Sequence, residues 1–208
     1  MVECAGLENR CGSKVHRGFK SHPFRQAKLI RTLLSVLFNL GVYMLICRQL
    51  NKNDEIKLFN LINQIEKNLN NPKFWLPINN ISKNHFFDDD WTYFLGLFDN
   101  DELIGASALF FNEHEFGESL SHCKNVKIPI AEIGRCMILP SYRGNNFIYK
   151  LNTELIKIAK EKGIKTVLAT IHPKNIPSQL SFAKLGFKTE TTIVKNNDYV
   201  RDVLLFEL

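Results

Sequence analysis

The segment from Ala131 to Tyr149, AEIGRCMILPSYRGNNFIY, constrains the fold of this chain most strongly, because the spacing of its apolar residues changes within it. An apolar run leads up to Pro140, the short polar turn SYRGNN follows, and apolar residues then recur at positions 147, 151, 155, 158 and 159. The run is typical of a buried strand, and the later spacing is typical of an amphipathic helix. The sequence therefore predicts a strand, a loop and a helix that runs to Lys162.

The loop before this helix has the features of an anion site. Asn145 or Asn146 can cap the helix, and Gly163 can adopt the left-handed conformation that ends it. The unpaired N–H groups of the first helical turn and the positive end of the helix dipole favour a phosphate. Arg143 adds a charge that can bond a phosphate through two N–H groups. The alternative is an ordinary strand–helix connection, which also contains Gly and polar residues.

The sequence around Arg143, PSYRGNNF, resembles the loop of the GNAT superfamily of N-acetyltransferases, whose pattern is R/Q-x-x-G-x-G/A between a strand and a long helix. The segment 172–187, HPKNIPSQLSFAKLGF, resembles the family's N-x-x-(A/S)-x-x-x-(Y/F)-x-K-x-G-F motif. Both motifs occur in order and at the expected separation, and the resemblance covers residues 44–208. It implies an α/β domain with a mixed, mostly antiparallel sheet and helices on both faces.

The resemblance also implies acetyl-CoA as a co-substrate, with its pyrophosphate on the loop amides, and no metal. Asn146 and Ile148 depart from the family pattern, which has Gly and then Gly or Ala at these positions. Asn tolerates a positive φ angle better than most residues, whereas Ile148 is bulkier than the family residue. The cofactor-binding residues that the resemblance implies are Ile138, Leu139, Arg143, Gly144, Asn145, Asn146, Phe147, Ile148, Asn175 and Ser178. Asn175 is also expected to cap the helix that follows it.

Acetyl transfer to an amine requires a base, because most amines are protonated at neutral pH. Glu132 is the candidate, since its context AEIxxCxI resembles the base-bearing strand of the family's histone acetyltransferases. Partial burial there would raise the pKa of its carboxyl group. The alternative is a Glu at the edge of the sheet, paired with a Lys or Arg. A backbone N–H near 137–139 is expected to stabilise the oxyanion.

The acid that protonates the leaving thiolate is often a Tyr in this family, but the matching position here is Phe182. Tyr149 and Ser178 are substitutes by proximity, and a solvent proton is a further alternative. Cys136, inside the predicted strand, is expected to be a core residue rather than a nucleophile. The resemblance implies that an acyl group, namely acetyl, is transferred from CoA to a primary amine. The amine attacks the thioester directly while both substrates are bound in a ternary complex. The alternative is a non-catalytic acyl-CoA-binding or sensor module.

Residues 1–43 are predicted to lie outside the domain. An apolar run from Leu33 to Cys47 has the outline of a membrane anchor, but Asn39 and Gly41 interrupt it and it is short for a span. The family commonly begins with a strand close to its initiator, and Met44 stands at that place. The segment AGLENRCGSKV also resembles the conceptual translation of a bacterial transfer-RNA gene. We therefore expect 1–43 to be an upstream misreading of the start codon, with a membrane anchor or a flexible extension as alternatives.

The charge distribution argues against a nucleic-acid partner. Of the net charge of +6, residues 1–43 contribute +5, with 7 Lys and Arg against 2 Asp and Glu, which leaves +1 for residues 44–208. The expected partner is a small-molecule or peptide amine, without a membrane, and the expected assembly is a monomer or homodimer. The five cysteines form no paired framework, which favours a cytoplasmic location.

The remaining patterns predict the other elements of the domain. An apolar stripe predicts a helix from Asn53 to Leu69, and the Asn-rich segment 70–90 is expected to form part of the acceptor pocket. Its sequence HFFDDD is interpreted as a solvated turn or, alternatively, a metal cluster or a cradle for a cationic amine. Two hairpins are predicted, at 93–111 and 187–206, with a polar surface loop at 112–127. The segment 164–171 is expected to form a strand that splays away from the one ending at Leu139.

Overall fold

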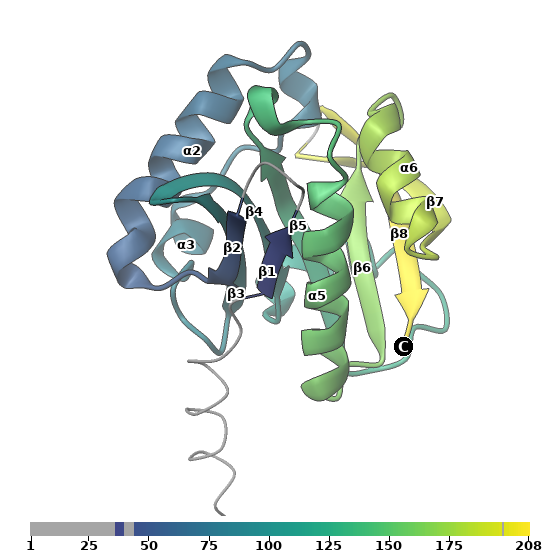
Figure 1. Cartoon of the computed structure of the whole chain (residues 1–208). Helices are drawn as coiled ribbons and strands as arrows, with labels where there is room; N and C mark the ends of the chain where they lie inside the picture. Colours follow the sequence, from purple (N-terminus) through teal and green to yellow (C-terminus); the bar gives the residue numbers. More distant parts are fainter. Residues whose placement is uncertain (1–35, 40–43, 197) are drawn as a thin grey trace, which may run out of the picture. The chain divides into compact units, whose positions relative to one another are not determined.

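The structure, a computed structural model, describes residues 36–39, 44–196 and 198–208, and nothing is described of the side chains of 36–39 (Figure 1). Most of the predicted extension, 1–43, and the first part of the predicted anchor segment therefore lie outside the described residues. The exception is a short strand at 36–39, which pairs with the strand that begins at Met44.

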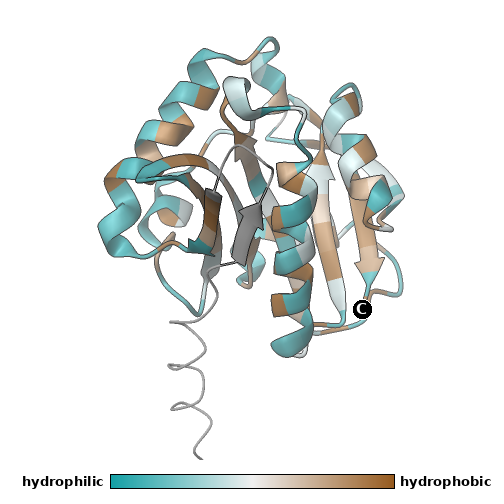
Figure 2. Cartoon of the chain, in the orientation of Figure 1, coloured by the Kyte–Doolittle hydropathy of each residue, from teal (hydrophilic) through white to brown (hydrophobic). Residues whose placement is uncertain are grey.

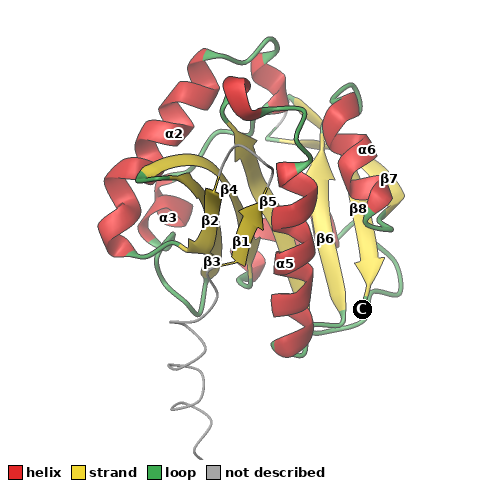
Figure 3. Cartoon of the chain, viewed as in Figure 1, coloured by secondary structure: helices red, strands yellow, loops and turns green. Residues whose placement is uncertain are grey.

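The described residues form one sheet of eight strands in the order β1-β2-β3-β4-β5-β6-β8-β7 (Figure 3). Every neighbouring pair is antiparallel except β5 and β6, which are parallel. The predicted mixed, mostly antiparallel sheet is confirmed. The strands are β1 Val36–Asn39, β2 Met44–Gln49, β3 Thr92–Asp99, β4 Glu102–Phe110, β5 Ile130–Ile138, β6 Thr166–Ile171, β7 Lys188–Lys195 and β8 Tyr199–Glu207.

Five α-helices and three short 3₁₀ turns connect the described strands. The helices are α2 Glu55–Lys67, α3 Asn80–Asn84, α4 Glu113–Leu120, α5 Phe147–Glu161 and α6 Ile176–Lys184. The 3₁₀ turns are η1 Lys52–Asp54, η2 Pro72–Phe74 and η3 Pro140–Tyr142. The predicted helix 53–69 corresponds to α2, and the predicted strand, loop and helix correspond to β5, η3 and α5.

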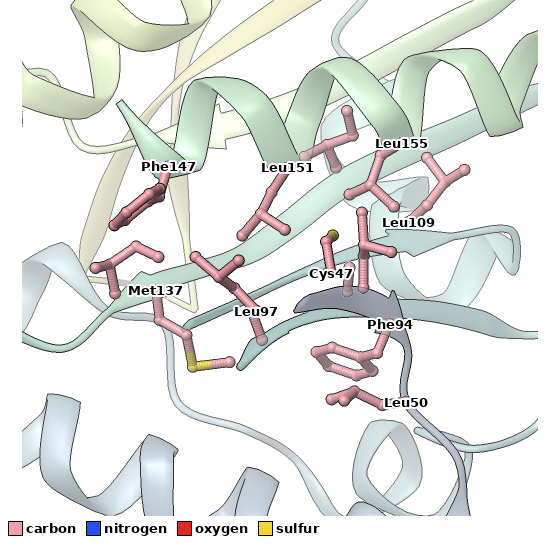
Figure 4. Packing of buried hydrophobic residues seen from close by; sticks show 14 of the residues in the cluster. Cys47, Leu50, Phe94, Leu97, Leu109, Met137, Phe147, Leu151 and Leu155 are labelled. Carbon is pink, nitrogen blue, oxygen red and sulfur yellow. The ribbon is translucent and has the colours of Figure 1, made fainter. Parts of the chain in front are cut away.

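Helices cover both faces of the sheet, as expected. On one face, Leu151 and Leu155 of α5 point toward Leu97 of β3 (Figure 4). Because successive side chains of a strand point to opposite faces, Phe94 of β3 lies on the other face. There its ring contacts Phe86, which stacks in turn on a phenylalanine of α2. Figure 2 shows apolar residues along the strands and largely hydrophilic outer surfaces on α2 and α5.

The predicted surface loop at 112–127 is wrong, because its first half forms the helix α4. The Asn112 side chain accepts a hydrogen bond from the His114 N–H at 2.9 Å, which caps this helix. Phe116 is buried and packs with Ile130 and Leu168 of the sheet. The segment has too few apolar residues to form the apolar stripe of an amphipathic helix. With Phe116 as its one large buried side chain, it shows no helical period in the sequence.

Two features of strand order position the candidate site. β5 and β6 are paired only from Ile130 to Glu132, so they separate beyond Glu132, which confirms the expected splay. β8 lies between β6 and β7, so the C-terminal strand is an inner strand of the sheet. The hairpin formed by β7 and β8 thereby brings residues far along the chain next to β6.

Candidate active site

The loop that joins β5 to α5 has a backbone open to a ligand. Gly144 has a φ angle of +85°, and a Cβ atom added there would meet no atom within 4 Å. Asn146 stands at the start of α5 with a φ angle of 58°, the left-handed conformation that Asn tolerates. The N–H groups of the first turn of α5 have no partner within the helix. The loop thus leaves backbone donors available in front of the helix.

The prediction that an Asn side chain caps each of these helices is wrong. Asn146 and Asn175 do occupy the capping positions of α5 and α6, but neither side chain forms a capping hydrogen bond. Their backbone carbonyls accept the first helical N–H groups instead. The Asn145 side chain folds back onto the loop, where Nδ2 donates to the Tyr142 carbonyl at 3.1 Å. The left-handed φ of Asn146 turns its side chain away from the N–H groups that a cap would bind.

A cavity of about 660 Å³ lies in front of this loop, in the size range of sites for cofactors and drug-sized ligands. Eight of the ten predicted cofactor-binding residues line it, and Leu139 and Asn145 do not. Ile148 forms part of the wall without filling the space. Residues of α2, η2 and α6 complete the lining, among them Ile65, Phe74 and Lys184.

The open side of β5 presents backbone hydrogen-bonding groups to this cavity. The Leu139 N–H donates to the Ile104 carbonyl of β4 at 2.9 Å. Because alternate residues of a strand bond to opposite sides, the N–H and C=O groups of Ile138 face away from β4, toward the gap that leads to β6. Consistent with this, Nε of Arg143 donates to the Ile138 carbonyl at 3.3 Å. An amide-containing chain in the cavity would find a donor there.

A second cavity, of about 130 Å³, contains Glu132. The Glu132 side chain is only 6% exposed, and its Oε1 accepts a hydrogen bond from the Thr170 hydroxyl at 2.9 Å. Burial raises the pKa of Glu132 above that of an ordinary carboxyl group, while Lys195 and Thr170 act in the opposite direction. Glu132 does not lie at the sheet edge, and within the described residues it forms no ion pair. The alternative of an edge Glu is therefore wrong.

The two cavities are contiguous. Phe74, Trp75, Cys136, Asn175 and Ser178 line both of them. A ligand that extends from the loop along β5 would therefore end beside the cavity that holds Glu132. This arrangement joins a loop with available backbone donors, an open strand edge and a buried carboxyl group.

His172 is a titratable residue of the smaller cavity that the sequence interpretation missed. Burial, with the nearby charges of Arg201 and Lys174, lowers the pKa of His172, which favours its neutral form. Its Nδ1 accepts a hydrogen bond from the Lys174 N–H at 3.1 Å, so in neutral His172 the proton is on Nε2. Nε2 is then a donor, and the lone pair of Nδ1 is already used by the Lys174 N–H.

The residues considered for proton donation and covalent chemistry lie around the same space. Phe182 is buried against Phe187, with ring centroids 5.0 Å apart, and offers no hydroxyl group. Tyr149 is 36% exposed and lines the larger cavity, while Ser178 lines both. Burial raises the pKa of Cys136 to about 11, so its thiol stays protonated at neutral pH.

Four charged residues of the smaller cavity, Glu115, Arg135, Lys195 and Arg201, were not singled out from the sequence. Lys195 is buried two positions after Ile193, and Arg201 is buried two positions before Val203. Every second residue of a strand points to the same face. The sequence could therefore have shown that these two cations point to the same side as apolar core residues. For Glu115, on a helix that the sequence did not reveal, no such signal existed.

The sequence HFFDDD lines neither cavity. Its His85 stacks on the Trp91 ring at 3.8 Å, and Nδ1 of His85 lies 3.1 Å from the Asp88 carboxylate. The segment forms the predicted turn before β3, but the turn is not solvated throughout, because Phe86 is buried in the core. Within the described part of the chain no group of three His, Cys, Asp or Glu residues is placed to hold a metal ion. Nor does any helix among these residues have the length and apolar character needed to cross a bilayer.

Comparison with known proteins gave a family match and similar folds. Residues 56–187 match the model of the family described as "Acetyltransferase (GNAT) family". A search of curated proteins gave no match. A probable acetyltransferase from Staphylococcus epidermidis has a similar structure, with a TM-score of 0.59 and 20% identity over 79% of this chain and 99% of that chain.

Two further structures have the same fold at low identity. The GNAT domain of S. lividans PAT is 18% identical, with a TM-score of 0.57 over 79% of this chain and 90% of that chain. Arabidopsis thaliana NAA60, solved in complex with acetyl-CoA, is 13% identical, with a TM-score of 0.60 over 79% of this chain and 99% of that chain. These similarities extend the family match to the three-dimensional arrangement of strands and helices.

Proposed function

Because the chain belongs to the acetyltransferase (GNAT) family, we propose that it transfers an acyl group, acetyl, from acetyl-CoA to a primary amine by direct attack in a ternary complex. The observation that carries this proposal is the contiguity of the two cavities, one in front of the loop at Arg143 and one around Glu132. The solved acetyl-CoA complex of NAA60, which has the same fold, supports the choice of co-substrate.

The residues present fit a phosphate-bearing co-substrate. The open space beside Gly144 allows close approach to the loop backbone, and the first-turn N–H groups of α5 favour an anion. Arg143 would add a charge-assisted hydrogen bond to a phosphate oxygen. The pantetheine arm would lie along the open side of β5, in the cavity that Asn175 and Ser178 also line.

Glu132 would act as the general base. Its carboxylate accepts a proton from the ammonium group of the acceptor, directly or through water, and the free amine attacks the thioester carbonyl carbon. The raised pKa of Glu132 brings its basicity closer to the working pH than that of an ordinary carboxylate. A C–N bond forms, the C–S bond breaks, and the Ile138 N–H is the nearest candidate to stabilise the oxyanion on the open side of β5.

The nitrogen loses its second proton to solvent as the amide forms. The CoA thiolate leaves with the electron pair of the C–S bond and takes up one proton. Phe182 cannot supply that proton, whereas Ser178 lines both cavities and Tyr149 lines the larger one. Solvent is the third source. Cys136 has no covalent role in this scheme, because burial keeps its thiol protonated.

The acceptor would be a small-molecule or peptide amine, and the protein would work as a monomer or homodimer in the cytoplasm. The three cysteines that the structure describes, Cys47, Cys123 and Cys136, are all free, which is consistent with a reducing compartment. A non-catalytic acyl-CoA-binding module of the same fold is the second candidate. Phe182, which offers no acid, is the observation that favours it.

Calorimetric titration of the full chain with acetyl-CoA and CoA tests this proposal. We expect a roughly micromolar Kd that Arg143→Ala weakens by about tenfold or more. Lys160→Ala, which removes a positive charge from the exposed far end of α5, is the control and should leave the Kd unchanged. Thiol release against a panel of amines then separates an enzyme from a binding module. Absence of acetyl-CoA binding would contradict both.

A further inference from the structure

The smaller cavity has more positive than negative side chains. Its lining contains two carboxyl groups, Glu115 and Glu132, and three cations, Arg135, Lys195 and Arg201. Lys195 and Arg201 are buried, with 7% and 1% of their surface exposed. Even with both carboxyl groups ionised, the five side chains sum to one net positive charge. Buried cations are costly unless an anion compensates them.

Among the described residues these cations form no ion pair with a carboxylate, although Glu115 and Glu132 attract Arg135, and Lys195 attracts Glu132. Arg201 donates to two backbone carbonyls, those of Lys73 at 2.8 Å and Val200 at 2.7 Å. Arg135 likewise donates to the carbonyl of Leu76. Each guanidinium has more N–H donors than these bonds use. Among the described residues, neither forms an ion pair with a carboxylate.

Lys195 has even fewer partners. Within the described residues its ammonium group forms no hydrogen bond and no ion pair, although the residue is buried on β7 and lines the cavity. Lys188, on the same strand, is exposed to solvent. The Lys195 ammonium group is not enclosed by protein atoms but is open to the cavity, so a ligand in the cavity can bring it a partner.

The side chains of Arg135 and Arg201 line the same cavity, so their charges repel each other. Burial and the charge of Arg135 lower the pKa of Arg201 to about 10, against the opposite influence of Tyr199. This repulsion would be relieved by an anion in the cavity that both residues line, since arginine binds anions through parallel N–H donors.

Resting on the proposed function, we propose that the acceptor is a small amine that also carries an anionic group, a carboxylate or a phosphate, which Arg135, Lys195 and Arg201 bind in the smaller cavity. The amine of the same molecule then lies within the cavity that contains Glu132. A volume of about 130 Å³ suits a molecule of amino-acid size. The excess of cations disfavours a diamine or polyamine acceptor.

A binding experiment tests the anion site without knowledge of the acceptor. The full chain is first titrated with CoA, which reports on the proposed function by itself, and is then kept saturated so that the loop at Arg143 is occupied. Inorganic phosphate and propionate are titrated into this complex. We expect at least one of them to bind with a Kd of about 1 mM or lower.

Lys195→Met should weaken that anion binding by about tenfold or more, whereas Lys188→Met, the same change at an exposed position of β7, should not. Lys195→Met removes no hydrogen bond of the described chain, so the fold should persist, as circular dichroism would check. Failure of both anions to bind the CoA complex would overturn the inference and leave the acetyltransferase proposal intact. Anion binding that is equal in Lys195→Met and the unmodified chain would overturn it as well.

Turnover measurements distinguish a carboxylate from a phosphate as the anionic group of the acceptor. Thiol release is compared for β-alanine, O-phosphoethanolamine, propylamine and 1,3-diaminopropane. We expect one of the two anionic amines to have the highest kcat/KM, and their ratio identifies carboxylate or phosphate. Lys195→Met should raise KM for that amine about tenfold more than it raises KM for propylamine. Preference for the diamine would contradict the proposal, and if none of the four reacts, the anion titration decides.

Discussion

The hydroxyl group of Thr170 donates a 2.9 Å hydrogen bond to Oε1 of Glu132 across the point where β5 and β6 separate. Glu132 is the last residue of β5 that is paired with β6, and Thr170 lies two residues beyond its partner Leu168. The bond therefore holds the carboxyl group at the entrance of the gap between the strands. It also stabilises the ionised form of a carboxyl group whose pKa burial raises.

Replacing Thr170 by Val should shift the pH dependence of the reaction. Without the hydroxyl, the carboxylate of Glu132 loses a stabilising bond, so the pKa of Glu132 rises further. Since the base is active when ionised, the kcat–pH profile should move to higher pH. Thr170→Ser keeps the hydroxyl and is the control. A profile that falls in height without moving along the pH axis would contradict this role.

Replacing Glu132 by Gln should lower kcat by about 10² to 10⁴ and abolish the rise of kcat with pH. Activity measured from acidic to alkaline pH checks both effects. Retention of the pH-dependent rise in Glu132→Gln would assign the base to another group.

The same variant should become more stable at neutral pH. The pKa of Glu132 is higher in the folded than in the unfolded chain, so the folded state binds the proton more tightly. The stability of the unmodified chain is therefore lost as the pH rises from the ordinary carboxyl pKa through the raised one. Glu132→Gln removes this loss, and urea denaturation at acidic and neutral pH would show it. A less stable Glu132→Gln at neutral pH would contradict the burial argument.

Substitutions at Gly144 and Gly163 can separate the effect of backbone strain on stability from an effect on acetyl-CoA binding. Both have left-handed φ angles, +85° and +76°, and a Cβ atom at either would meet no atom within 4 Å. Alanine at each position should cost about 1 to 2 kcal/mol of stability. Only Gly144→Ala should weaken acetyl-CoA binding, because Gly163 lies at the other end of α5. Equal effects on the Kd would exclude close approach of the phosphates at Gly144.

A buried polar cluster beneath α5 should matter for stability rather than for chemistry. The Ser107 hydroxyl donates to Oδ1 of Asn152 at 2.7 Å, and both residues are fully buried. Asn152→Leu leaves the hydroxyl without this acceptor and should cost about 1 to 3 kcal/mol in chemical denaturation. An unchanged free energy of unfolding in Asn152→Leu would contradict a stabilising role of this hydrogen bond.

Cys136 belongs to the same cluster, with its sulfur 3.1 Å from the Ser107 hydroxyl. Cys136→Ala should keep kcat within several-fold of the unmodified enzyme, because a thiol with a pKa of about 11 is not a nucleophile at neutral pH. Trapping of an acetylated Cys136 by mass spectrometry would contradict direct attack.

The elements whose signals are local could be predicted from the sequence. The change of period between β5 and α5, the end of α5 at Gly163 and the two hairpins each depend on residues close together in the chain. The splay beyond Glu132 followed from the resemblance of two motifs. Local conformational preference and side-chain period decide such features before distant segments meet.

Only the tertiary structure decided the contents of the smaller cavity and the nature of the segment 112–127. α4 depends on the packing of Phe116 against distant strands, which no short-range pattern reports. Lys195 and Arg201 reach the cavity of Glu132 because β8 inserts between β6 and β7. The sequence by itself determined the strand, loop and helix from β5 to α5. Strand order determined which charges line the smaller cavity, since burial and Coulomb interaction depend on distance in space rather than along the chain.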